Sequence, residues 1–115
     1  MVKKHRQVIA YKHYFLDFYQ NQSVSVQLKI EWTLNLIQTM PRVPEKYFKH
    51  FEGVKGLYEV RVEAESNIYR IFSFFDRGNL VILGNAFQKK SNKTPLKEIE
   101  KAIRIRNEYF NENKT

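Results

Sequence analysis

The sequence contains no cysteine among its 115 residues. A disulfide framework, a zinc site with cysteine ligands and a thiol nucleophile are therefore excluded. Glycine and proline are scarce, at four and three residues, and each glycine stands singly, as a turn residue does. No G-x-S-x-G pattern, phosphate loop or dinucleotide-binding pattern occurs. The sequence therefore gives no sign of a serine hydrolase, a phosphate-loop nucleotide hydrolase or a dinucleotide-dependent enzyme.

Long apolar runs are also missing: none approaches the roughly 20 residues of a membrane span. The basic stretch 1–6 is not followed by the apolar core of a signal peptide. We therefore expect a cytoplasmic protein with no membrane association. His5, His13 and His50 are scattered without ligand spacing, so we expect no metal site and no other cofactor.

The composition that is present is that of a folded, basic protein. Hydrophobic residues make up 43% and aromatic residues 15%, which is incompatible with wholesale disorder and predicts one domain over residues 1–115. Lys and Arg number 20 against 12 Asp and Glu, for a net charge of +8. Such an excess favours a polyanionic partner: a nucleic acid, an anionic membrane surface or an acidic protein.

The N-terminal third has two predicted elements, one of them ambiguous. Aromatic residues at helical spacing predict a short amphipathic helix over 12–21. Between Val24 and Leu36, apolar residues alternate with polar ones, and this pattern alone favours a half-buried strand. Read as a helix, the segment is apolar nearly all round, which suits a helix between a sheet and a partner protein.

The rest of the chain predicts a loop, a meander and a helix. Residues 45–56 form a loop with one helical turn at most, and strands follow over 57–64, 68–75 and 80–87, joined by turns at 65–67 and 76–79. Thr94 and Pro95 predict a helix start, with Thr94 as the cap. Its apolar arc comprises Leu96, Ile99, Ala102, Ile103, Tyr109 and Phe110, with Arg106 inside it. This order is that of an α+β domain.

Basic residues on the strands are the best candidates for chemistry. If the first two strands pair as a hairpin, Arg61 and Arg70 come close on one face, and Lys89 and Lys90 follow the third strand. Such a cluster suits a phosphate and stabilises the negative charge of a phosphoryl-transfer transition state. In the alternative reading, Arg61 pairs with a neighbouring Glu59 or Glu63, and Arg70 with a buried carboxylate.

Three segments carry a resemblance to a known family. They are Gly56-Leu57-Tyr58-Glu59-Val60-Arg61, Tyr69-Arg70-Ile71-Phe72, and Phe87-Gln88-Lys89-Lys90 with Thr94-Pro95 a few residues on. In this order and spacing they resemble the phage-derived, HigB-like branch of the RelE/ParE toxin superfamily. The resemblance implies two N-terminal helices packed on a small antiparallel β-sheet, with a C-terminal helix. It also implies that residues 23–40 are helical, and we follow it there.

The resemblance implies a function as well: the toxin of a type II toxin–antitoxin system. The RelE-like and HigB-like members that the sequence resembles cleave messenger RNA on the ribosome, without a metal, by attack of a ribose 2′-hydroxyl on the adjacent phosphate, and so inhibit translation. The implied partners are a helix-turn-helix (HigA-like) antitoxin, the ribosome and mRNA. By motif position the catalytic candidates are Arg61, Arg70, Lys89, Lys90 and Glu59. The predicted RNA-binding residues are Lys49, Lys55, Lys93 and Phe87, the last being either a core residue or a base-stacking one.

The sequence departs from the family pattern at two points. Glu59 stands where RelE-like toxins carry a second lysine, and Ser91-Asn92-Lys93 stands where related toxins carry a functional histidine or tyrosine. The general base is therefore open, with Glu59 and Glu45 as candidates, and Glu59 has a structural alternative as the partner of Arg61 or Arg106. Two other functions remain: a ParE-like inhibitor of DNA gyrase without nuclease activity, and an inactive basic nucleic-acid-binding module.

Overall fold

A computed structural model describes residues 3–113 of the chain. Its elements, in chain order, are β1 (Gln7–Ala10), α1 (Tyr14–Gln20), α2 (Val24–Thr39), β2 (Phe48–His50), β3 (Tyr58–Ala64), β4 (Asn67–Asp76), β5 (Leu80–Lys89) and α3 (Leu96–Glu112). None of the helices in this part of the chain is long and apolar enough to span a lipid bilayer.

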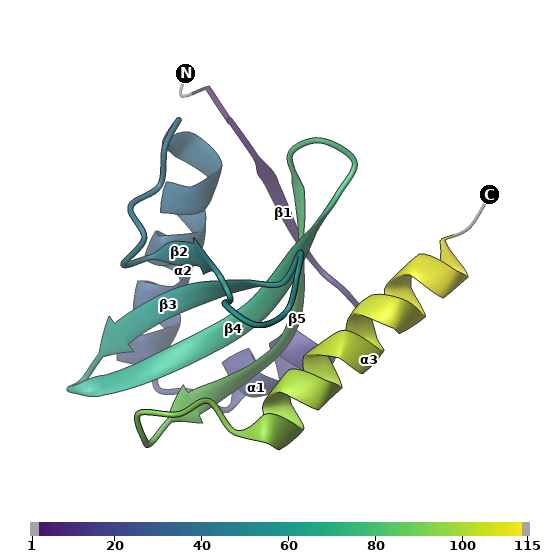
Figure 1. Cartoon of the computed structure of the whole chain (residues 1–115). Helices are drawn as coiled ribbons and strands as arrows, with labels where there is room; N and C mark the ends of the chain where they lie inside the picture. The colour runs from purple at the N-terminus through teal and green to yellow at the C-terminus, as the bar shows by residue number, and fades with distance from the viewer. Residues whose placement is uncertain (1–2, 114–115) are drawn as a thin grey trace.

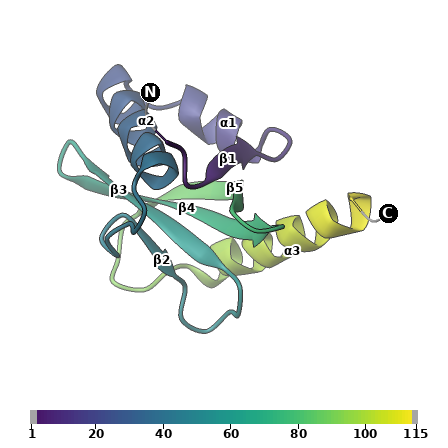
Figure 2. The ribbon, with the colours of Figure 1, turned by 90° about the horizontal axis from the view of Figure 1, so that it is seen from above.

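The elements form three layers, with the sheet as the middle layer. Helices α1 and α2 cover one face of the sheet and α3 crosses the other, as the view from above shows (Figure 2). The β3–β4–β5 meander forms the middle of the sheet (Figure 1). The predicted class, α+β, is thus confirmed, with three helices, the last of them C-terminal, and a five-stranded sheet.

The prediction of a purely antiparallel sheet preceded by helices is wrong. The sheet has five strands in the order β1-β5-β4-β3-β2, and its first strand comes before both helices. β1 pairs in parallel with β5, from Gln7 opposite Leu80 to Ala10 opposite Leu83, while the other pairs are antiparallel. A parallel partner far along the chain leaves no trace in a four-residue local pattern, which is why this strand was missed.

Residues 24–39 are helical, as the family resemblance implied and as the alternating pattern did not. Ser23 caps the helix, its Oγ accepting a hydrogen bond from the Val26 amide at 3.2 Å. Val26, Ile30 and Ile37 are buried against the sheet. Apolar residues also lie on the exposed side of the helix, at Val24, Leu28 and Trp32. Buried and exposed apolar residues together produce the alternating pattern, which therefore does not indicate a strand.

Two further boundaries differ from the sequence prediction. Residues 48–50 form the edge strand β2 inside the segment expected to be a loop. The cap of α3 is Pro95 and not Thr94, and no side chain supplies a capping hydrogen bond there. The first turn of α3 depends instead on the Pro95 carbonyl, which accepts from the amides of Glu98 and Ile99.

The buried side of α3 is also shifted from the predicted arc. Ala102, Ile105 and Tyr109 are buried, whereas Leu96 and Phe110 are exposed at the two ends of the helix. Arg106 is half-buried, and its Nη1 donates to the Lys55 carbonyl at 2.9 Å. That hydrogen bond ties α3 to the loop before β3, so Arg106 has no role in pairing Glu59.

An extra residue in β5 changes which face its later side chains occupy. Ser73 lies opposite Leu83 and Ile71 opposite Ala86, so β5 advances three residues where β4 advances two. Leu83 packs with α1 and α2, whereas Phe87 packs with Phe72 and Ala102 below α3. The bulge therefore brings the end of β5 onto the face that carries Arg70.

Candidate functional site

Three rows of cross-strand neighbours form the site on the α3 face of the sheet. One row is Lys49, Glu59 and Phe72, the next is Arg61, Arg70 and Phe87, and the third is Glu63, Ile68 and Lys89. Helix α3 and the aromatic rings cover only part of this face, because the chain leaves β5 through the loop 90–95 before α3 begins. The other end of the face, with its cationic side chains, stays open.

Arg61 and Arg70 lie directly opposite each other on β3 and β4. The Arg61 amide donates to the Tyr47 carbonyl at 2.8 Å, away from β4, so this is a non-hydrogen-bonded pair, the type whose side chains come closest. Two guanidinium groups in such a position repel each other unless an anion lies between them. The strand register thus places two cationic side chains where a shared anion would relieve their repulsion.

Arg70 lies at the boundary between the core and the open end, with only 4% of the residue exposed. Its Nε lies 3.1 Å from Oε2 of Glu59. Its Nη1 is buried and makes no hydrogen bond within the described part of the chain. Burial lowers the pKa of Arg70, the nearby Glu59 carboxylate opposes that effect, and Arg61 adds to it. A buried cationic donor with unused capacity is one that a bound anion would satisfy.

Lys89 is the neighbour of Arg70 on the other side. Burial lowers the pKa of Lys89, and the positive charge of Arg70 lowers it further. Arg61 and Lys49 act on the pKa of Lys89 in the same direction, while Glu59 raises it. Four cations therefore act on one another electrostatically at this end of the sheet.

The candidate residues line one hollow of about 420 Å³. Its walls are Arg61, Ile68, Arg70, Lys89, Lys90, Ser91 and Asn92. The structure thus brings together Arg61, Arg70, Lys89 and Lys90, as the sequence predicted. Their roles in chemistry stay predictions.

Glu59 is in the same cluster but has a different partner from either predicted one. It forms an ion pair with Arg70 and not with Arg61 or Arg106. Its side chain is 9% exposed, so it contributes to the hollow through the guanidinium that it holds. Glu45, the other candidate base, is exposed in the segment before β2 and does not line the hollow.

The predicted RNA-binding residues divide into three cases. Lys49 lies beside Glu59 on the same face, close enough to affect Lys89. Lys93 is exposed in the loop after β5, next to the hollow, and Lys55 is exposed in the loop before β3. Phe87 is 8% exposed and packs on Phe72 with ring centroids 5.6 Å apart. Its ring belongs to the core, which is the first of the two alternatives that the sequence left open for this residue.

Sequence reasoning missed Ile68, Ser91 and Asn92 as lining residues. Ser91 and Asn92 directly follow the basic end of β5, which is the signal that would have found them. The Ser91 hydroxyl donates to the Lys93 carbonyl at 3.0 Å and so shapes the loop.

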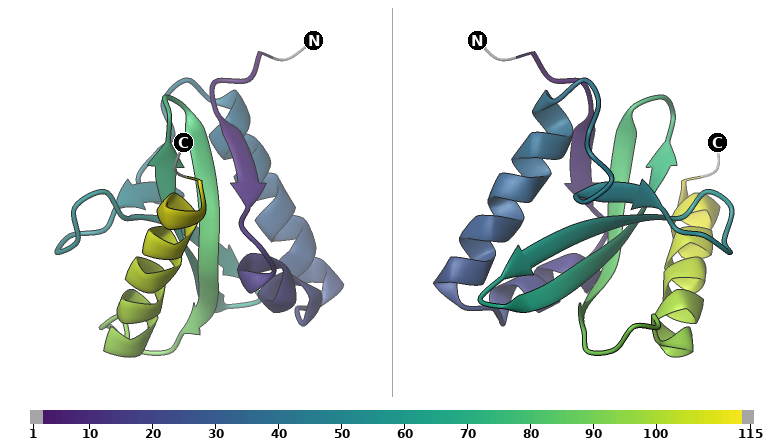
Figure 3. Two further views of the ribbon diagram at one scale, coloured as in Figure 1. Left: turned by 90° about the vertical axis from the view of Figure 1, so that its right-hand side faces the viewer. Right: turned by 60° about the vertical axis from the view of Figure 1, so that its left-hand side comes forward.

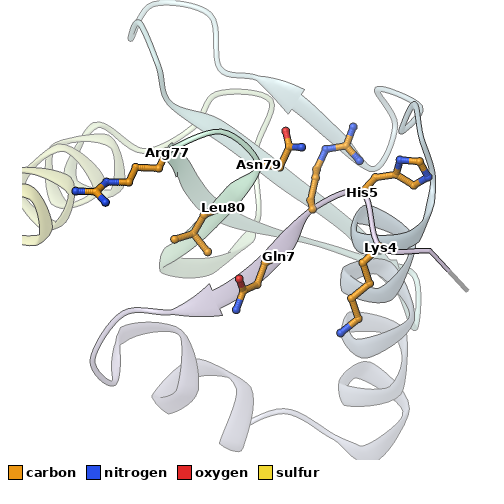
Figure 4. Close-up of a pocket in the computed structure, with 7 residues that line it drawn as sticks. Lys4, His5, Gln7, Arg77, Asn79 and Leu80 are labelled. Atoms are coloured by element: carbon orange, nitrogen blue, oxygen red, sulfur yellow. The ribbon is translucent and has the colours of Figure 1, made fainter.

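A second basic hollow, of about 500 Å³, lies where β1 meets the β4–β5 turn. In Figure 4, Arg77 extends to the left, whereas Lys4 lies at the right and points downward, so the two side chains do not meet. Arg6 also lines this hollow, and its guanidinium donates hydrogen bonds to the carbonyls of Ile37, Met40 and Pro41 at 2.9 to 3.0 Å. These cations do not converge, so this hollow is not an anion site.

Within residues 3–113, no group of three or more His, Asp or Glu side chains is arranged so that it could hold a metal ion.

Fold and site together define a small basic α+β domain with a cation-lined hollow at one end of its sheet, which suits an anion and is called the anion-binding hollow below. A family model described as "Phage derived protein Gp49-like (DUF891)" matches residues 17–107. The chain belongs to this Gp49-like family, which is part of the RelE/ParE-like toxin superfamily of toxin–antitoxin systems. No curated protein matches the chain. The family points to a toxin with an antitoxin partner, which is the coarser part of what the resemblance implied.

Proposed function

We propose that the chain is a HigB-like toxin of a type II toxin–antitoxin pair, a ribosome-dependent mRNA endoribonuclease that acts in the cytoplasm. The observation that carries the proposal is the hollow in which Arg61, Arg70, Lys89 and Lys90 converge, with the buried Nη1 of Arg70 unpartnered. Four cations around one hollow suit the phosphate of an RNA backbone.

In the proposed reaction, the ribose 2′-hydroxyl gives up its proton to solvent water, its oxygen attacks the adjacent phosphorus, and the bond from phosphorus to the 5′-oxygen breaks. The products are a 2′,3′-cyclic phosphate and a 5′-hydroxyl. The phosphoryl group gains negative charge in the transition state, and Arg61 and Arg70 neutralise it from adjacent strands. Because those groups are already positioned, they require little reorganisation during the reaction.

Lys89 is the proposed proton donor to the leaving 5′-oxygen. A lysine with a lowered pKa releases its proton more readily than an ordinary lysine, and the pKa of Lys89 is lowered by burial and by Arg70. Glu59 acts in this proposal by positioning Arg70, to which it is paired. Lys49, Lys55, Lys90 and Lys93 hold the RNA backbone.

The test is a primer-extension assay on a defined message in a purified translation system, with the wild type and Arg70→Ala. We expect new 5′ ends at codons in the ribosomal A site, absent with the variant and absent without ribosomes. Lys97→Ala, a charge removed from exposed α3, is the matched control and is expected to cleave normally. Intact transcripts under conditions where the protein still arrests growth would refute the nuclease and redirect the search to DNA gyrase.

A further inference from the structure

The anion-binding hollow contains a lysine whose amine is not held in an ion pair. Lys89 is the last residue of β5, is half-buried, and lines the hollow together with Arg61 and Arg70. Within residues 3–113 no carboxylate forms a salt bridge with it. Figure 3, right, shows the chain leaving the sheet at the bottom of the molecule and crossing through loop 90–95 to α3. The end of β5 therefore lies at the periphery, where a small solute can reach it.

The surroundings of Lys89 favour the uncharged form of its amine. Burial lowers the pKa of Lys89, and the positive charges of Arg70, Arg61 and Lys49 lower it further, while Glu59 opposes them. A lysine that is desolvated or placed beside other cations is the kind that acts as a nucleophile near neutral pH. The cations that repel the ammonium group thus make the amine more reactive.

The guanidinium groups supply the second part of the site. Arg61 and Arg70 lie opposite each other on β3 and β4, and the buried Nη1 of Arg70 has no hydrogen-bond partner in the described part of the chain. A phosphate satisfies that donor and relieves the repulsion between the two arginines. One hollow is therefore lined both by phosphate-binding groups and by a nucleophile.

These two parts match the chemistry of an acyl phosphate. In such a molecule a single oxygen joins the phosphorus to an electrophilic carbonyl carbon, so the carbonyl lies beside any group that binds the phosphate. The charges also allow the amine to stay neutral, because Arg61, Arg70 and Lys90, less the charge of Glu59, offset a phosphate dianion. The burial of Lys89, the largest cause of its lowered pKa, persists when the ligand is bound.

We propose that the anion-binding hollow is also a site of covalent modification, in which an acyl phosphate is bound by Arg61 and Arg70 and transfers its acyl group to Lys89. The lone pair of Nζ attacks the carbonyl carbon. The bond from that carbon to the bridging oxygen breaks, its electron pair stays on the oxygen, and the proton lost by the amine passes to the departing phosphate. The products are an amide on Lys89 and inorganic phosphate.

The modification switches off the cationic cluster. An amide is neutral, so acylation removes one positive charge from the hollow and leaves no proton for the leaving 5′-oxygen of RNA. This consequence rests on the proposed function, and with it we expect the acylated protein to lose mRNA cleavage. The reaction of Lys89 with an acyl phosphate does not rest on that function.

The test exposes the whole protein to acetyl phosphate at neutral pH, without ribosomes or RNA, and measures the acetylation rate of each lysine by mass spectrometry of its peptides. Lys55 and Lys97, which are exposed and outside the hollow, are the internal references. We expect Lys89 to react about tenfold faster than either, the gain from one hydrogen bond between the phosphate and a charged group. Added inorganic phosphate, which competes for the arginines, is expected to remove most of that excess.

A neutral reagent separates the binding of phosphate from the reactivity of the amine. N-acetoxysuccinimide delivers the same acetyl group without a phosphate, so we expect a smaller excess at Lys89, and one that inorganic phosphate does not remove. The circular dichroism spectrum before and after each reaction checks that the protein stays folded.

Arg61→Gln is the decisive variant, because Arg61 lines the hollow but is not the partner of the buried Glu59. It is expected to slow the acetylation of Lys89 by acetyl phosphate about tenfold, and the acetylation by the neutral reagent much less. Arg104→Gln, the same change at an exposed position of α3, is the matched control and is expected to react like the wild type.

Equal rates at Lys89 and Lys97 with acetyl phosphate overturn the proposal. So does an excess at Lys89 that is the same for both reagents, since the hollow would then activate the amine without binding the phosphate. Acetylation of Lys90 in place of Lys89 overturns the choice of nucleophile. The outcome is independent of primer extension: a protein that is acetylated selectively at Lys89, but whose unmodified form leaves messages intact, retains the modification site and loses the nuclease.

Discussion

Arg70 and Glu59 form a nearly buried ion pair, with Nε and Oε2 3.1 Å apart and side chains 5% and 9% exposed. The contact is one of charge and not an aligned hydrogen bond, since both atoms are without a hydrogen-bond partner in the described chain. The pair is diagonal across β3 and β4, with Phe72 opposite Glu59. It holds a guanidinium at the edge of the core with its Nη1 free for an anion.

Arg70→Ala leaves the Glu59 carboxylate buried without its partner. We expect it to abolish mRNA cleavage and to lower the free energy of unfolding by about 3–5 kcal/mol, the usual cost of breaking a buried pair. The double variant Glu59→Gln with Arg70→Gln removes both charges and is expected to recover most of that stability without cleavage. Urea unfolding and primer extension on the same preparations measure both effects. Cleavage by the double variant at the wild-type rate would contradict the site.

Lys89→Gln is expected to stabilise the protein at neutral pH while it impairs cleavage. The pKa of Lys89 is lowered on folding, so its charged form is penalised in the folded state. That penalty is complete below the folded pKa and fades as the pH rises toward the ordinary value of 10.5. The stability gain of the variant should therefore shrink between neutral pH and pH 10.5. Lys90→Gln, at the exposed residue directly after β5, controls for the loss of one positive charge. A gain that is constant with pH would refute the electrostatic explanation.

Asn85→Ala tests the bulge that directs the end of β5. The Asn85 amide donates to the backbone carbonyl and to Oε1 of Glu98, at 3.0 and 3.1 Å, and so ties the bulge to the start of α3. Losing these hydrogen bonds is expected to cost about 1–3 kcal/mol of stability. It is also expected to reduce cleavage, because the bulge places Lys89 on the same face of the sheet as Arg70. Gln88→Ala, an exposed residue on the same strand, is the control. Unchanged stability with unchanged cleavage would show that the bulge holds without this tie.

Tyr109→Phe tests the packing of α3 at alkaline pH. The Tyr109 hydroxyl donates to Oδ2 of Asp76 at 2.6 Å, and burial followed by this bond raises the pKa of Tyr109 to about 12. The group therefore contributes stability that is complete below pH 10 and is lost between pH 10 and about 12. We expect the variant to be less stable by about 1 kcal/mol at neutral pH and to lose less stability over that alkaline range. Thermal unfolding from pH 8 to 12 measures the stability of both proteins. An identical loss of stability between pH 10 and 12 in both would contradict the assignment of this loss to Tyr109.

Much of the fold was readable from local sequence. The turns predicted at 65–67 and 76–79 do separate the three long strands, although Asn67 and Asp76 belong to β4. Positive φ angles at Glu65, Ser66, Arg77 and Gly78 fit tight hairpin turns. The hairpin reading also placed Arg61 next to Arg70, because the register of two strands joined by a short turn follows from the turn itself. The alternation over 24–36 misled because α2 is apolar on two sides, one for the sheet and one exposed.

The sequence by itself determined the strands of the meander, the basic residues at their ends and the excess of positive charge. Only the tertiary structure decided the parallel pairing of β1 with β5, the ion pair of Glu59 with Arg70, and the face on which Lys89 lies. The physical reason is common to all three. Parallel pairing joins distant segments, a charge chooses among partners by their three-dimensional distance, and one extra residue in β5 reverses the face of every side chain after it.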